Sequence, residues 1–139
     1  MYEETTSRSV DPGAAFEDYL TRLDLSGMWV AEDRDESVVG FVGLLLDGQV
    51  GEVEPIVVTP TRRGEGVGRA LLARVTDEGR RRGLRELSIS PRLRNIEALH
   101  CLYAAGFDAA AALRLTLDLS GRQRRWRDGI DLHGLRLRY

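Results

Sequence analysis

Residues 57–72 read Val-Val-Thr-Pro-Thr-Arg-Arg-Gly-Glu-Gly-Val-Gly-Arg-Ala-Leu-Leu, and this stretch decides the fold. An apolar run ends, glycines follow at alternate positions 64, 66 and 68, and an apolar helical pattern begins. This order predicts a strand, a glycine-rich turn and the N-terminus of a helix. Such a terminus presents unpaired backbone N–H groups, and glycine lets an anion approach closely. The turn is therefore a candidate anion site flanked by Arg63 and Arg69, although a tight turn without a ligand is the alternative.

Two common phosphate-binding loops do not fit this turn. The Walker pattern needs a Lys-Ser/Thr pair after its last glycine, whereas Val67-Gly68 stands here. The dinucleotide fingerprint needs the spacing G-x-G-x-x-G, whereas the spacing here is G-x-G-x-G. The sequence thus excludes both of these nucleotide sites.

Hydrophobic periodicity and turn signals divide the rest of the chain into helices and strands. The elements predicted before the turn are a helix from Asp11 to about Leu23 and an antiparallel meander of three strands, Met28–Glu32, Val38–Leu46 and Val50–Val58, with a hairpin turn at Asp47-Gly48. The elements predicted after it are a helix to about Arg82 closed by Gly83, a strand Leu84–Ser90, a helix from about Asn95 to Ala105 closed by Gly106, and strands Leu113–Leu119 and Ile130–Tyr139.

This order predicts an α/β (α+β) fold with a mixed, mostly antiparallel sheet. The central strand–helix–strand unit implies one parallel pair of strands joined by a crossover. A length of 139 residues fits a single domain over residues 1–139, with a polar, flexible segment up to about residue 10.

Composition narrows the class of protein. Hydrophobic residues make up 42% and charged residues 30% of the chain, which is ordinary for a soluble protein. The single cysteine, Cys101, excludes a disulfide framework, and neither His100 nor His133 has a partner at metal-ligand spacing, so no metal site is predicted. No apolar run reaches the roughly 18 residues of a membrane helix, and the N-terminus lacks a signal pattern. We therefore expect a cytoplasmic protein that does not bind membranes.

Charge is distributed unevenly along the chain. Residues 1–60 carry 13 acidic residues and 3 arginines, whereas residues 61–139 carry 9 acidic residues and 17 arginines. If the halves form two sides of one site, a cationic substrate approaches the first and an anionic one the second; uneven solvated surface is the alternative. The arginine clusters at 80–82 and 122–127 are short, and Trp126 is their only interleaved aromatic residue. Solvated surface is the better interpretation, and no nucleic-acid partner is predicted.

Two segments resemble the GNAT superfamily of N-acetyltransferases. Arg63-Gly64-Glu65-Gly66-Val67-Gly68 is similar to the acetyl-CoA loop of that family, Arg/Gln-x-x-Gly-x-Gly/Ala. Residues 87–107 resemble a second block, in which a strand and an asparagine precede a helix that ends in Tyr and Gly-Phe. The resemblance covers roughly residues 37–119, and it implies a GNAT-like fold whose first strand and helix are reduced or missing.

The resemblance implies direct attack of a primary amine on the thioester of acetyl-CoA, which is the co-substrate. It implies that backbone groups of one strand pair with the pantetheine arm and that the glycine-rich turn holds the pyrophosphate. The cofactor-binding residues implied are Ile56, Val57, Val58, Arg63, Gly64, Gly66, Val67, Gly68, Arg69 and Asn95.

Proton transfer needs a base for the amine and an acid for the departing thiolate. Glu52 and Glu54 project from one face of their strand and are the candidate bases, with water as the alternative. Partial burial of either carboxylate would raise its pKa toward a useful value. Tyr103 is the candidate acid by the resemblance, and a packed tyrosine with a surface hydroxyl is the alternative.

The acceptor amine stays open, because the missing N-terminal unit commonly shapes the acceptor pocket in the family. A second interpretation is a non-catalytic sensor or scaffold that binds acyl-CoA with the same fold. Late apolar strand residues, among them Leu135 and Leu137, need cover, so a homodimer is expected.

Overall fold

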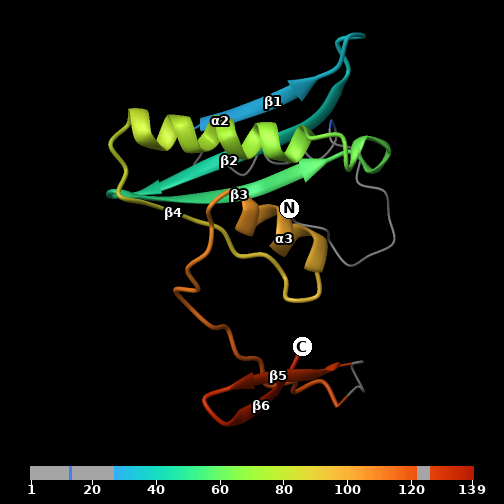
Figure 1. Ribbon diagram of the computed structural model, residues 1–139, viewed down its shortest axis with the longest axis vertical. Helices are drawn as coiled ribbons and strands as arrows, with labels where there is room; N and C mark the ends of the chain where they lie inside the picture. Colours follow the sequence, from blue (N-terminus) through green and yellow to red (C-terminus); the bar gives the residue numbers. More distant parts are fainter. Residues whose placement is uncertain (1–12, 14–26, 122–125) are drawn as a thin grey trace. The chain divides into compact units, whose positions relative to one another are not determined.

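The computed structural model describes residue 13, residues 27–121 and residues 126–139 (Figure 1). The chain divides into two compact units, residues 1–107 and residues 108–139, and each is described by itself below. The helix predicted from Asp11 to Leu23 lies outside the described residues, Gly13 excepted. A single domain over the whole chain stays a prediction.

The first unit is built on a four-stranded mixed sheet. Its strands are β1 (Gly27–Glu32), β2 (Val38–Asp47), β3 (Val50–Val58) and β4 (Glu86–Ser88), which lie in the order β1-β2-β3-β4. The pairs β1–β2 and β2–β3 are antiparallel, whereas β4 runs parallel to β3. The predicted meander and the parallel strand–helix–strand unit are both confirmed.

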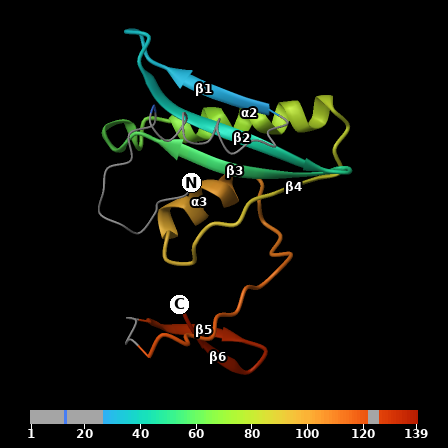
Figure 2. The ribbon, with the colours of Figure 1, turned by 180° about the vertical axis from the view of Figure 1, so that it is seen from behind.

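The core forms between this sheet and its helices. The apolar run of β2 is buried almost throughout, as expected for a central strand covered on both faces. Helix α2 (Val67–Arg81) packs against all four strands, and helix α3 (Ile96–Ala104) contributes Leu102 to the core. In both views of the ribbon, β3 lies between α2 and α3 (Figures 1 and 2). The strand that leads into the glycine-rich turn is thus held from two sides.

Gly40 on β2 lets the N-terminal end of α2 come close to the sheet. A Cβ atom at this position would lie 2.8 Å from the Val57 carbonyl oxygen and 3.2 Å from the side chain of Val67. Any larger residue would therefore displace the start of α2, which is where the candidate site begins.

Helix ends follow the sequence signals. Gly83 has a left-handed φ of 71° just after α2, which suits the residue that terminates a helix. Asn95 caps α3, because its side-chain Oδ1 accepts a hydrogen bond of 3.1 Å from the backbone N–H of Ala98. The predicted limits of both helices are confirmed to within a residue or two.

The strand predicted for Leu84–Ser90 is shorter in the structure. It pairs with β3 only through Glu86, Leu87 and Ser88, which face Val50, Gly51 and Glu52. Beyond Glu52 the described chain gives β3 no further partner on that side. The two strands therefore part where the sequence pattern predicted continued pairing.

The second unit departs from the predicted strands. The strand predicted at Leu113–Leu119 is wrong, because residues 108–119 form no strand and their leucines are exposed, from 50% at Leu113 to 86% at Leu119. Alternation of leucine with polar residues favours a strand only where a neighbouring strand pairs with it. None of the described strands does so here.

The single strand predicted at Ile130–Tyr139 is also wrong. A hairpin stands there, made of β5 (Asp128–Leu132) and β6 (Leu135–Arg138). Its turn residues, His133 and Gly134, have φ values of 52° and 79°, as the two central positions of a type I′ turn require. A histidine at the first of these positions hid the turn from sequence patterns.

In the part of the chain that the structure describes, no helix has both the length and the apolar character needed to span a bilayer.

A cluster of charges stabilises the C-terminal half of α2. The Glu78 side chain is only 5% exposed, and it accepts hydrogen bonds from Arg81 and, at 2.7 Å, from Arg82 Nε. These bonds, that of Arg81 above all, lower the pKa of Glu78 from its ordinary 4.5 to about 2. Because the folded state lowers this pKa, the stabilisation is present above about pH 4.5 and is lost as the pH falls toward 2.

We expect Glu78→Gln to lower the melting temperature by several degrees at pH 7, because the arginines lose their charged partner. The difference in melting temperature between wild type and Glu78→Gln should become smaller below about pH 4.5 and disappear near pH 2. The control is Asp77→Asn, since Asp77 is 72% exposed and pairs with Arg80 on the same helix turn. Thermal unfolding measured from pH 7 to pH 2 checks both; equal melting temperatures of Glu78→Gln and wild type at pH 7 would contradict the expectation.

Candidate active site

The glycine-rich turn connects β3 to α2 and presents the N-terminus of that helix. After β3 the chain makes a short 3₁₀ helix, η1 (Pro60–Arg62), and then a turn that ends at Gly66. Gly64 and Gly66 have φ values of 78° and 87°, which glycine adopts without strain. A Cβ atom at either glycine would enter open space. The backbone conformation of the turn thus favours glycine at positions 64 and 66. The space beside these two residues is open.

The first turn of α2 leaves backbone donors available. The first intrahelical hydrogen bond runs from Ala70 N–H to the Gly66 carbonyl, 3.0 Å away. The N–H groups of residues 67–69 come before it and therefore have no acceptor within the helix. No side chain of the described residues caps this end of the helix. These donors and the positive end of the helix dipole lie where the sequence predicted an anion site, and the binding of an anion there stays a prediction.

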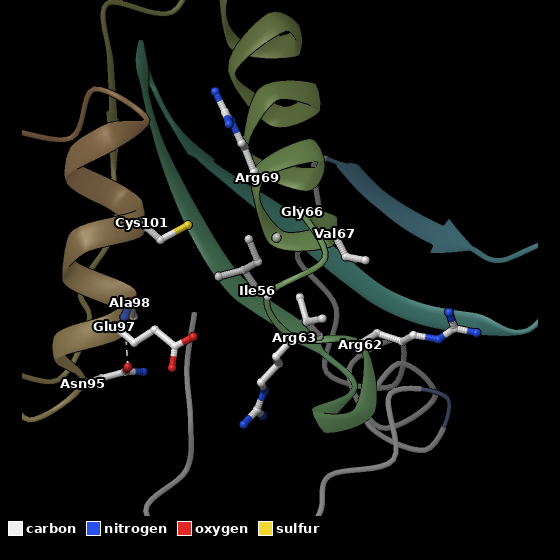
Figure 3. Close-up of a pocket in the computed structure, with 13 residues that line it drawn as sticks. Ile56, Arg62, Arg63, Gly66, Val67, Arg69, Asn95, Glu97, Ala98 and Cys101 are labelled. Atoms are coloured by element: carbon white, nitrogen blue, oxygen red, sulfur yellow. Dashed lines mark hydrogen bonds between the residues drawn. The ribbon is translucent and has the colours of Figure 1, made fainter.

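A cavity of about 240 Å³ lies between this turn and α3 (Figure 3). The turn and α2 contribute one wall, the end of β3 contributes the base, and the N-terminal half of α3 contributes the other wall. The lining residues are Ile56, Val58, Arg62, Arg63, Gly64, Gly66, Val67, Gly68, Arg69, Asn95, Glu97, Ala98 and Cys101.

The cavity continues along the end of β3, where the sheet opens. Pairing between β3 and β4 stops at Glu52, whereas β3 runs on to Val58, with Ile56 and Val58 in the cavity wall. An extended ligand laid beside this stretch can pair with backbone groups in the manner of an added strand. The anion site and an extended slot thus form one continuous surface.

A bulge in the pairing of β2 with β3 lies just beyond Glu52, where β3 and β4 part. Val42 faces Ile56 and Leu44 faces Val53, so Glu54 and Pro55 together stand opposite the single residue Gly43. A bulge of this kind changes the direction of a strand and of its side chains. Glu54 therefore lies at this bulge, two residues before Ile56 in the cavity wall, while Glu52 lies where β4 still pairs.

The structure brings most of the predicted cofactor residues together. Those in the cavity wall are Ile56, Val58, Arg63, Gly64, Gly66, Val67, Gly68, Arg69 and Asn95. Val57 belongs to the same strand but is not part of the wall. The binding roles themselves stay predictions.

The predicted proton-transfer residues lie outside this wall. Glu52 and Glu54 are exposed on β3, so the partial burial expected of a base is not present. Tyr103 is 69% exposed on α3 and is likewise absent from the cavity wall. Their roles stay predictions of the resemblance, and the geometry favours Glu54 through its position at the bulge.

Four residues of the wall were not predicted. Ala98 and Cys101 follow Asn95 at intervals of three along α3, and this helical spacing is a signal that could have found them. Glu97 directs its carboxylate toward the cavity, and its place in the first turn suits the helix dipole (Figure 3). Arg62 extends away from Arg63 in the same view, so the two neighbouring side chains point in different directions.

In the described ranges no three histidine, cysteine, aspartate or glutamate side chains gather in a way that could hold a metal ion.

Comparisons with known proteins agree with this arrangement. Residues 2–107 match the family model described as the acetyltransferase (GNAT) family. An IAA acetyltransferase from Azospirillum brasilense is 45% identical over 56 residues, which are 39% of this chain and 37% of that protein. The chain therefore aligns with well under half of this curated relative.

Two solved structures illustrate the similarity in three dimensions. Nourseothricin acetyltransferase is 36% identical with a TM-score of 0.54, and the match covers 57% of this chain and 48% of that one. The structure of AAC(6')-Iy with a CoA-based bisubstrate analogue has a TM-score of 0.60 at 21% identity, covers 82% of this chain and 83% of that chain, and shows the shared fold alone. The match over residues 2–107 and the strand–turn–helix geometry together show that the chain belongs to the acetyltransferase (GNAT) family.

Proposed function

We propose that this protein is an acetyl-CoA-dependent N-acetyltransferase that transfers an acetyl group to a primary amine by direct attack in a ternary complex. The observation that carries the proposal is the cavity of about 240 Å³, which joins the N-terminus of α2, where no described side chain provides a cap, to the open end of β3. A CoA molecule has the same two parts, a charged pyrophosphate and an extended pantetheine arm. A relative of the same fold, AAC(6')-Iy, has been solved in complex with CoA.

The residues of the cavity match these parts in order. Backbone N–H groups of the turn, from Gly64 to Arg69, would hold the pyrophosphate, with the Arg63 guanidinium beside it. The pantetheine arm would lie along Ile56, Val57 and Val58, with Asn95 at the far wall. In this orientation the thioester would lie toward the bulge at Glu54-Pro55.

The reaction needs two proton transfers. The amine nitrogen attacks the carbonyl carbon, a C–N bond forms, the C–S bond breaks, and the thiolate receives a proton while the nitrogen loses one. We assign the base to Glu54, because it stands at the bulge, and not to Glu52. The acid role of Tyr103 stays a prediction to which its exposed position gives no support, and water in the open cavity is the alternative donor.

An amine panel with acetyl-CoA as donor tests the proposal. The protein is mixed with acetyl-CoA and EDTA, and thiol release is followed with an aminoglycoside, a polyamine, an amino acid and a lysine-containing peptide. We expect amine-dependent release with at least one of them. A non-catalytic acyl-CoA sensor would instead bind acetyl-CoA in calorimetry and release no thiol with any amine, and absence of both would contradict both interpretations.

Three further features belong to the proposal: a cytoplasmic location, a homodimeric assembly, and an acceptor whose identity the panel must establish.

A further inference from the structure

The glycine-rich turn has a hollow on each side. Besides the cavity toward α3, a second cavity of about 320 Å³ lies between the turn and the connection from β1 to β2. Arg62, Gly66 and Val67 line both. Described side chains therefore leave space on the β1–β2 side of the turn, so polar contacts contribute more to its support there.

A single carboxylate connects the two segments across this hollow. Asp33 Oδ2 accepts a hydrogen bond of 3.0 Å from Arg62 Nη2, which joins residues 29 positions apart in the chain. Asp33 Oδ1 accepts backbone N–H bonds from Asp35 at 2.9 Å and from Ser37 at 3.2 Å, and these order the β1–β2 connection. Both oxygens of Asp33 are thus engaged, one with its own turn and one with Arg62.

Arg62 is held at three points. Its side chain pairs with Asp33 and, at 3.5 Å, with Glu65 Oε2, and its backbone N–H donates to the Thr59 carbonyl at 3.0 Å. The Asp33 side chain is only 18% exposed, so water screens this pair less than an ordinary surface pair. The guanidinium points away from Arg63, which leaves the face toward α3 for an anion (Figure 3).

We propose that Asp33 is a positioning residue for the anion-binding turn: through Arg62 it holds residues 60–66 in the conformation that aims the N–H groups of α2 at the pyrophosphate. The inference rests on the proposed function for the identity of the ligand. It assigns a role in cofactor binding to an acidic residue that does not touch the cofactor.

Asp33→Asn tests this role, because positioning and simple electrostatics predict opposite signs. Removing a negative charge near an anion site should strengthen CoA binding by Coulomb attraction alone. Loss of the positioning contact should instead weaken acetyl-CoA binding, by about fivefold, which is the scale of one partly exposed ion pair. The matched control is Asp35→Asn, which removes the same charge from the same connection without breaking a described ion pair.

A second acetyl donor distinguishes a loss of turn positioning from a general loss of active-site structure. The acetyl thioester of N-acetylcysteamine lacks the pyrophosphate, so its KM should be the same in Asp33→Asn and in Asp35→Asn. We expect weaker binding of acetyl-CoA in calorimetry for Asp33→Asn only, with recovery in Asp33→Glu. Equal or tighter binding than in Asp35→Asn, or an equal loss for both donors, would overturn the proposal.

Hydrogen exchange in the free protein gives a test that does not depend on the ligand. The backbone amides of Arg63 and Ala70, which donate to the carbonyls of Pro60 and Gly66, should exchange faster in Asp33→Asn and in Arg62→Gln than in wild type or Asp35→Asn. Unchanged exchange there would overturn the positioning role. If exchange changes as expected but no variant, nor the wild type, binds acetyl-CoA, the proposed function fails while the positioning contact stands.

Discussion

Gly66→Val should weaken the binding of acetyl-CoA by about 10²-fold while leaving α2 folded. Gly66 lines the cavity, and an added Cβ atom meets no protein atom within 4 Å, so the new side chain would occupy the space assigned to the pyrophosphate. Loss of two charge-assisted hydrogen bonds at about 1.5 kcal/mol each weakens binding by about 10²-fold. Calorimetry with acetyl-CoA measures this directly.

The control for backbone strain lies at the other end of the same helix. Valine at Gly66 must adopt a φ near 87°, which costs about 1–3 kcal/mol of stability. Gly83 has a φ of 71°, equally open surroundings and no place in either cavity wall, so Gly83→Val carries a similar strain without a steric block. We expect both variants to melt at lower temperature and only Gly66→Val to lose affinity for acetyl-CoA; equal affinities in the two would contradict the assignment.

Glu54→Gln should lower kcat by about 10²-fold at pH 7 with the amine that the panel identifies, in the range of a lost general base. Glutamine keeps the size of the side chain at the bulge but cannot accept the proton of the attacking amine. The deficit should shrink as the pH approaches the pKa of the amine, which is about 10 for a lysine-type amine and about 8 for an α-amino group, because the nucleophile is then already neutral. Steady-state kinetics from pH 6 to pH 10 measure both effects.

Glu52→Gln is the matched control for this substitution. Glu52 is exposed on the same strand and carries the same charge, but it stands where β3 still pairs with β4. A loss of electrostatic attraction for a cationic amine would raise KM in both variants to a similar degree. A kcat of Glu54→Gln within a few-fold of wild type would remove Glu54 from the mechanism and leave water as the base.

The sheet, the turn and the two described helices α2 and α3 could be predicted because their signals are local. The apolar run of β2, the glycines at 64, 66 and 68, and the cap at Asn95 each act within a few residues of the structure that they specify. Residues 57–72 therefore predicted the strand–turn–helix, whereas the binding of an anion at its turn stays a prediction. The family resemblance then pointed to Asn95, which lies in the opposite wall.

The remaining features depend on contacts between distant segments. The pairing of Arg62 with Asp33 joins positions that no periodicity relates, and the early end of β4 depends on where β3 turns away at its bulge. Strand patterns in residues 113–119 were misleading because alternation specifies a face and not a partner. The exposure of Tyr103 likewise follows from how α3 is rotated against the core, with Leu102 turned inward.

Alkylation of Cys101 tests the central claim most directly, namely that acetyl-CoA occupies the cavity between the turn and α3. Cys101 is the only cysteine of the chain, it is partly exposed, and it lies in the cavity wall with its sulfur toward Ile56 (Figure 3). Acetyl-CoA at ten times its Kd should slow the reaction of Cys101 with iodoacetamide about tenfold, since about nine tenths of the sites are filled. Gly66→Val should show no such protection. An unchanged alkylation rate, at a concentration where calorimetry shows saturation, would place the cofactor elsewhere and contradict the account.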